Sequence, residues 1–321
     1  MATYTLPEGF TEFDMFTFGS ALLVGGMLGF FLNGISILSF LRVREMRNPS
    51  NFLVFNLAVA DLSLNINGLT AAYASYLRYW PFGQDGCAYH GFQGMIAILA
   101  SISFLAAIAW DRYHQYCTRQ KLFWTTSITI SSIIWILSIF WSAVPLMGWG
   151  IYDFEPMRTC CTLDYTKGDR DYITYMLSLV VLYLMLPAFN MYSCYDSIYK
   201  HFKKIHYHRF NTSLPLRVLL MCWGPYVIMC VYACFDNVKL VSPKLRMVCI
   251  YFVFCNLTLC VKMKQLNTRL YTSFFLLLLT FSLTVCCGFL VAVSVIISNL
   301  CFLCAFSLVD ASSYCKDKSY I

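Results

Sequence analysis

The sequence predicts an all-α multi-pass membrane protein, arranged as a bundle of seven transmembrane helices. Of its 321 residues, 59% are hydrophobic and only 12% are charged, whereas a soluble domain carries about 25% charged residues. The mean hydropathy is +0.64, and apolar stretches of about 20 residues recur, which is the length that crosses a bilayer core as a helix. Backbone polar groups in lipid must pair within their own segment, so we expect helices rather than strands.

Six apolar stretches are long enough to cross a membrane: Phe16–Phe40, Phe52–Leu77, His90–Ala109, Thr125–Met147, Tyr172–Tyr199 and Leu216–Phe235. The first stretch is too long for a signal peptide, and acidic rather than basic residues precede it. We expect these stretches to form the larger part of a helical bundle over residues 1–248.

The seventh span is predicted to be atypical. The apolar run Val248–Val261 covers about 21 Å as a helix, so it would just cross the membrane with Arg246, Lys262 and Lys264 snorkelling at its ends. Leu270–Val309 is nearly all apolar as well. We therefore expect residues 249–321 to form a separate, extra hydrophobic C-terminal segment with one to three spans.

The placement of basic residues predicts the topology. Lysine and arginine concentrate in the first, third and fifth loops, whereas the second and fourth loops are poorer in them or balanced by acids. The odd loops should therefore be cytoplasmic, with the N-terminus extracellular or lumenal, in the plasma membrane or an intracellular membrane. The net charge of +7 follows from this bias and requires no nucleic-acid partner.

Polar residues inside apolar stretches indicate functional positions, because they are costly in lipid and usually face the bundle interior. Asn33 and Asp61 are expected in a shared polar core that relaxes when the bundle rearranges, or as isolated buried groups. Arg112 follows Cys87 by 25 residues, roughly 37 Å along a helix, so Asp111-Arg112-Tyr113 should lie at the cytoplasmic end of the third helix. There Asp111 can hold Arg112 through a charge-assisted hydrogen bond, or Arg112 simply snorkels.

Prolines in the fifth and sixth stretches predict kinks. Pro187 is followed two turns later by Tyr195, and Trp223 lies two residues before Pro225, where the two could form a hinge. Each proline could equally be a packing kink. The sequence shows neither a nucleophile–base pair nor a metal-ligand constellation, so a conventional enzyme or a metal site is not expected.

The order of these landmarks, with Trp135 in the fourth stretch, resembles the rhodopsin-class G-protein-coupled receptors. Within that class the chain resembles the opsins, and most of all their retinal-photoisomerase branch. The resemblance covers about residues 1–248 and is carried by the following segments: CAYHGFQG (87–94), AAIAWDRYHQYCTR (106–119), PLMGWGIYDFEPMRTCCTLDYTKGDR (145–170), WGPY (223–226) and SPKLRMV (242–248). It implies a retinal-binding receptor, light-driven conversion of all-trans-retinal to the 11-cis form, and a disulfide between Cys87 and Cys161 that leaves Cys160 free.

The resemblance also implies a chromophore pocket. His90 stands three residues after Cys87, where many opsins carry a carboxylate counterion. A neutral histidine cannot balance a protonated Schiff base, so Glu155 in the outer loop is the better candidate; alternatively, the Schiff base is unprotonated. Four aromatic residues would line the polyene, or else form ordinary core: Trp223, Tyr226, Tyr183 and Tyr165.

The chromophore attachment point is unknown. Retinal is an aldehyde, so a buried primary amine is needed to form an imine. The opsin pattern places a lysine near position 254, where this chain has Phe254, and no proline follows Pro243 to form the Asn-Pro-x-x-Tyr motif of helix 7. Two further functions are therefore considered: signalling through a heterotrimeric G protein, and a variant without chromophore that has only a structural or regulatory role.

Overall fold

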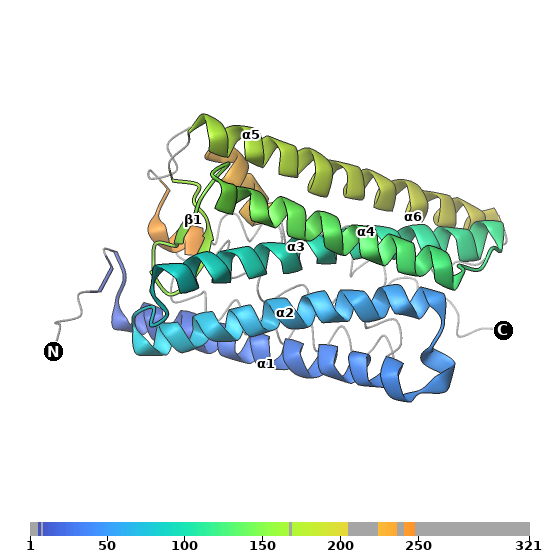
Figure 1. Ribbon diagram of the computed structural model, residues 1–321, viewed down its shortest axis with the longest axis horizontal. Coiled ribbons are helices and arrows are strands. Elements are labelled where there is room, and N and C mark those ends of the chain that lie inside the picture. Colours follow the sequence, from blue (N-terminus) through green and yellow to red (C-terminus); the bar gives the residue numbers. More distant parts are fainter. Residues whose placement is uncertain (1–5, 8, 167–168, 205–223, 236–240, 248–321) are drawn as a thin grey trace, which may run out of the picture. The chain divides into compact units, whose positions relative to one another are not determined.

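A computed structural model describes residues 6–7, 9–166, 169–204, 224–235 and 241–247, all within one compact unit, Met1–Met263 (Figure 1). The proposed division at residue 248, the C-terminal segment 249–321 and two predicted site residues, Trp223 and Phe254, lie outside this described part. The division of the chain therefore stays a prediction.

The first five predicted spans are confirmed as helices. Five helical segments in the described part are long and apolar enough to cross a membrane: Glu12–Arg42, Pro49–Leu77, Gly83–Thr118, Trp124–Met147 and Arg170–Lys203. Each begins a few residues before the apolar stretch that predicts it, or ends a few residues after it, because polar caps and charged ends extend a helix beyond its apolar core. In the sixth stretch, residues 224–232 are helical.

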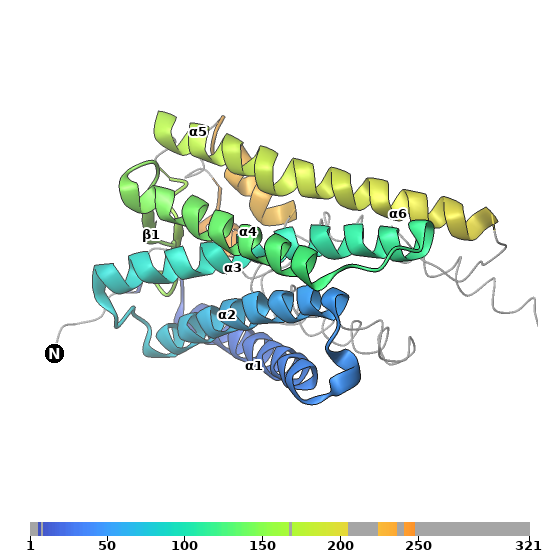
Figure 2. The same cartoon turned by 45° about the vertical axis from the view of Figure 1, so that its right-hand side comes forward.

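The first two helices, α1 (Glu12–Arg42) and α2 (Pro49–Leu77), start at well-defined caps. The side chain of Thr11 accepts a hydrogen bond from the Asp14 amide while Asp14 accepts one from the Thr11 amide, which is a capping box. Asn48 caps α2, with Pro49 at its first position. A three-residue 3₁₀ turn (Arg44–Met46) joins them, and the two helices lie side by side in both views (Figures 1 and 2).

Helix α3 (Gly83–Tyr113) packs against both α2 and α4 (Trp124–Ala143). It continues as a π-helical turn over His114–Thr118. Helix α4 passes into a 3₁₀ turn, Val144–Met147, which contains Pro145.

The fifth span is a continuous helix with a local distortion: α5 (Arg170–Leu179), a π-helical segment (Val180–Met185) and α6 (Leu186–Lys204). Pro187 explains the distortion. Proline has no amide hydrogen to donate one turn back, and its ring crowds the carbonyl there, so the preceding turn widens.

The outer loop between α4 and α5 contains a short antiparallel hairpin, β1 (Tyr152–Phe154) and β2 (Cys161–Leu163), in which Phe154 pairs with Cys161. The all-α prediction did not include it, because three-residue strands are too short to show an alternating pattern. The hairpin lies close to α3 at Gly91, where a β-carbon would come within 2.6 Å of the Tyr152 ring.

Two apolar clusters fill the described bundle. One cluster joins α2, α3 and α4 around Leu53, Leu57 and Phe104. The outer cluster joins α3, the hairpin, the fifth span and residues 226–233, and it is rich in tyrosine. The candidate site lies at this outer cluster.

Candidate functional site

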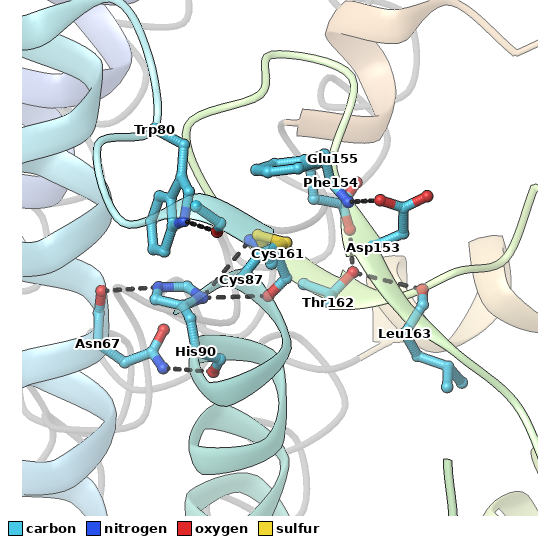
Figure 3. Close-up of a disulfide and its surroundings, with 11 residues drawn as sticks. Asn67, Trp80, Cys87, His90, Asp153, Phe154, Glu155, Cys161, Thr162 and Leu163 are labelled. Carbon is cyan, nitrogen blue, oxygen red and sulfur yellow. Dashed lines mark hydrogen bonds between the residues drawn. A yellow bond between two sulfur atoms is a disulfide. The ribbon is translucent and has the colours of Figure 1, made fainter. Parts of the chain in front are cut away.

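A disulfide fixes the hairpin to the outer part of α3. Cys87 and Cys161 are joined, with their Cα atoms 5.4 Å apart, so the pairing that the resemblance implied is present (Figure 3). The neighbouring Cys160 is a free, buried thiol, and burial raises its pKa well above the ordinary value. The covalent tether therefore holds β2 against α3.

His90 lies beneath this disulfide and faces backbone groups on two sides. Its Nδ1 is 3.1 Å from the Cys161 carbonyl oxygen and its Nε2 is 3.2 Å from the Asn67 carbonyl oxygen, while the Cys161 amide is 3.4 Å from Nδ1. With its proton on Nε2, a neutral ring donates to the Asn67 carbonyl oxygen and accepts from the Cys161 amide, whereas donation to the Cys161 carbonyl oxygen needs the proton on Nδ1. His90 thus connects α2 to the hairpin (Figure 3), and of the two candidate counterions only Glu155 presents a carboxylate.

Glu155 follows β1 and is only 2% exposed. Thr162 donates a hydrogen bond to its carboxylate (Figure 3), and the Tyr165 hydroxyl donates another at 2.5 Å. Burial raises the pKa of Glu155 to about 7, against the opposing effects of these two hydrogen bonds and of the Arg246 charge. An acid in this condition changes its charge near physiological pH, which is typical of functional carboxylates.

Arg246 is the functional candidate that sequence reasoning missed. We expected it to snorkel at a helix end, but this prediction is wrong: the residue is 8% exposed and buried. Its short helical turn, residues 243–247, is tied down because Lys244 forms a 3.0 Å ion pair with the buried Asp14. The guanidinium therefore remains inside, where it interacts electrostatically with Glu155.

The predicted aromatic lining is partly brought together. Tyr165, Tyr183 and Tyr226 belong to the same outer cluster, and Tyr226 interacts with Thr162 beside Glu155. Tyr172, which sequence reasoning did not single out, also lies there and donates to the Cys230 carbonyl oxygen at 2.9 Å. The carboxylate therefore stands at the edge of an apolar, tyrosine-rich region, and the role of these rings toward a polyene stays a prediction.

The C-terminal end of α3, which we predicted to be cytoplasmic, differs in one respect from expectation. Asp111 accepts hydrogen bonds from Ser50 at 2.9 Å and from Gln115 at 2.9 Å, while Arg112 donates to the Gln115 side-chain oxygen at 3.2 Å. No direct Asp111–Arg112 ion pair occurs among the described residues; Gln115 bridges the two. Arg112 also interacts electrostatically with Tyr195 of the fifth span.

The remaining predicted switch residues lie where the helices meet. Asn33 and Asp61 are both buried; Asn33 donates to the Gly29 carbonyl oxygen, and Asp61 accepts a hydrogen bond from Ser101 across the α2–α3 contact at 2.8 Å. Tyr113 packs edge-on against His114 at the end of α3. Pro225 lies in the helical segment 224–232.

Apolar helices long enough to span a membrane, a polar core in α2 and α3, and a hairpin tethered by a disulfide to α3 are typical of multi-pass membrane receptors of the seven-helix class. The family model "7 transmembrane receptor (rhodopsin family)" matches residues 32–263, and the chain belongs to this family. Crystallised squid rhodopsin has a similar fold, with a TM-score of 0.74 at 21% identity, covering 86% of this chain and 88% of that one.

Comparison with known relatives places the chain more narrowly within this family. The RPE-retinal G protein-coupled receptor of Mus musculus is 45% identical over 247 residues, which is 77% of this chain and 85% of the relative. The Homo sapiens protein of the same name is also 45% identical, over 77% of this chain and 84% of its own length. The visual pigment-like receptor peropsin of Mus musculus is 27% identical over 71% of this chain and 73% of its own length. The resemblance to opsins, and among them to RPE-retinal G protein-coupled receptors, is therefore confirmed.

Proposed function

We propose that this chain is an opsin-type membrane receptor that binds retinal and converts the all-trans form to the 11-cis form in light. The observation that carries the proposal is Glu155: a buried carboxylate, held by a disulfide-tethered hairpin, at the edge of a tyrosine-rich apolar cluster. Relatives of this chain at 45% identity are named for retinal.

The site suits an apolar ligand with one polar end. The outer cluster, including Tyr165, Tyr183 and Tyr226, offers apolar and aromatic surface for a polyene. Glu155 and Arg246 supply charge at one edge of that cluster. Retinal supplies the conjugated double bonds that absorb light, and the residues of the chain orient it, exclude water and favour one isomer of the product.

The residues of the site do not suit covalent attachment of retinal through an imine. None of the seven predicted spans contains a lysine, and Lys244, near the site, is engaged with Asp14. The attachment of retinal is thus separate from its binding, and the two must be measured separately.

The direct test uses the purified full-length protein in lipid nanodiscs. All-trans-retinal is added in the dark, the sample is illuminated, and the isomers are extracted and separated by chromatography. We expect the 11-cis isomer to exceed its yield in empty nanodiscs, and to fall when Glu155→Gln replaces the carboxylate. Equal yields with and without protein would refute the photoisomerase role, and absence of retinal binding would favour a chromophore-free structural or regulatory form.

Signalling through a heterotrimeric G protein is a second candidate, favoured by the Ser50–Asp111–Gln115–Arg112 network at the cytoplasmic end of α3. Among the described residues, the hydrogen bonds that link Arg112 to Asp111 run through Gln115, so a partner that binds the guanidinium replaces the one between Arg112 and Gln115. The test is light-dependent nucleotide exchange, which Arg112→Ala should abolish and the exposed control Lys121→Ala should preserve. Exchange that survives Arg112→Ala would argue against this function.

A further inference from the structure

The buried guanidinium of Arg246 has an unused hydrogen-bond donor. Its Nε is inaccessible to solvent and has no partner, unlike most buried polar atoms in the described part of the chain. An orphaned donor of a charged group is costly to bury. A donor kept in this state indicates a site where a ligand oxygen can complete the hydrogen bonding.

The surroundings of Arg246 specify the kind of ligand. Tyr165 and Tyr226 lie close enough to Glu155 to interact electrostatically with it, and Arg246 does so as well. The tyrosines belong to the outer apolar cluster. A ligand that reaches Nε therefore needs an oxygen acceptor at one end and a long apolar body, and it needs no charge of its own, because Glu155 in its ionised form balances the guanidinium.

The same arrangement makes a protonated imine unnecessary as the cation that balances Glu155. In a covalent complex, a protonated imine would be the cation that faces a buried carboxylate. In this chain a permanent cation already faces Glu155, since arginine stays protonated in proteins, and the predicted spans contain no lysine.

We infer that Arg246 is the polar anchor of a non-covalent retinoid site, donating from Nε to the terminal aldehyde oxygen of retinal while Glu155 balances its charge. No bond forms or breaks in this binding step. The inference rests on the proposed function, because it specifies how the same ligand is held.

The test compares matched variants and ligands in the full-length protein. Glu155→Gln is the reference variant, and Arg246→Gln/Glu155→Gln removes the anchor without leaving a buried charge uncompensated. Arg170→Met, at an exposed position at the start of α5, is the control for loss of an arginine. Binding of all-trans-retinal and of its hydrocarbon analogue, which lacks the oxygen, is followed by quenching of tryptophan fluorescence, and borohydride trapping with mass spectrometry detects any covalent adduct.

We expect retinal to bind without an adduct, and the double variant to bind it roughly 10- to 100-fold more weakly than the reference variant, as the loss of a hydrogen bond to a charged donor predicts. The hydrocarbon analogue should bind both variants equally, and Arg170→Met should match the unmodified protein. Equal retinal affinity in the double and reference variants, or an adduct on any lysine, would overturn the anchor while leaving retinal binding intact. A protein that binds no retinal at all would overturn the proposed function as well.

Discussion

The raised pKa of Glu155 makes the stability of the outer hairpin depend on pH. Burial raises this pKa from an ordinary value of 4.5 to about 7. At about 1.4 kcal/mol per pKa unit, this difference corresponds to about 3 kcal/mol of unfolding free energy. The folded state binds the proton of Glu155 more tightly than the unfolded state does. This contribution to stability is therefore fully present below pH 4.5, declines as the pH rises from 4.5 to about 7, and is lost above about pH 7.

The assay is thermal unfolding in nanodiscs at several pH values between 5 and 8, for the unmodified protein and for Glu155→Gln, which resembles the protonated acid. The unmodified protein should lose stability relative to the variant as pH rises, because only the carboxylate deprotonates. Asp85→Asn, at an exposed position in the first turn of α3, is the matched control and should show a much smaller change. A difference between the unmodified protein and Glu155→Gln that stays constant across this pH range would refute the reasoning.

Three further substitutions test the scaffold, each by the unfolding temperature in nanodiscs against the unmodified protein. Replacing Cys161 by serine opens a disulfide that spans 74 residues and should cost about 4 kcal/mol; an unchanged unfolding temperature would show that the tether is not structural. Gly91→Ala should cost about 1–3 kcal/mol by overpacking, because the new methyl would meet the ring of Tyr152, and a neutral result would mean that the hairpin shifts freely. Trp135→Phe should cost about 1–2 kcal/mol, since the indole donates to the side-chain oxygen of the buried Asn56 at 3.0 Å.

The described helices were predictable because each is indicated by a long run of apolar residues rather than by any single residue. A run such as Phe52–Leu77 contains enough apolar residues that its length alone selects a membrane helix. The hairpin at Tyr152–Phe154 was not predictable, because it depends on a disulfide and on a close approach to Gly91 rather than on local sequence. The same holds for the π-helical segment Val180–Met185: Pro187 predicts a kink, but the form that the backbone takes depends on its neighbours.

The candidate site was predictable only where a residue has a distinctive chemical type. Glu155 could be proposed because the resemblance to opsins places its loop over the chromophore, where a carboxylate can balance a protonated Schiff base. Arg246 was assigned to the membrane edge, because sequence alone cannot show that the ion pair of Lys244 with Asp14 holds its helical turn in place. Gln115 was overlooked for a similar reason, since the link between Asp111 and Arg112 depends on side-chain geometry.

The charge balance around Glu155 decides what kind of opsin this chain can be. A buried carboxylate is tolerated when it is protonated or faces a cation, and here both conditions contribute: burial raises the pKa to about 7 while Arg246 and two hydrogen bonds oppose that rise. A cation that is part of the chain remains in place whether or not ligand is bound. The site can therefore keep its charges paired while retinoid enters and leaves, whereas an imine would bring a cation to this carboxylate only as long as the ligand stays attached. Exchange of the ligand, rather than its permanent retention, is the behaviour that this arrangement favours.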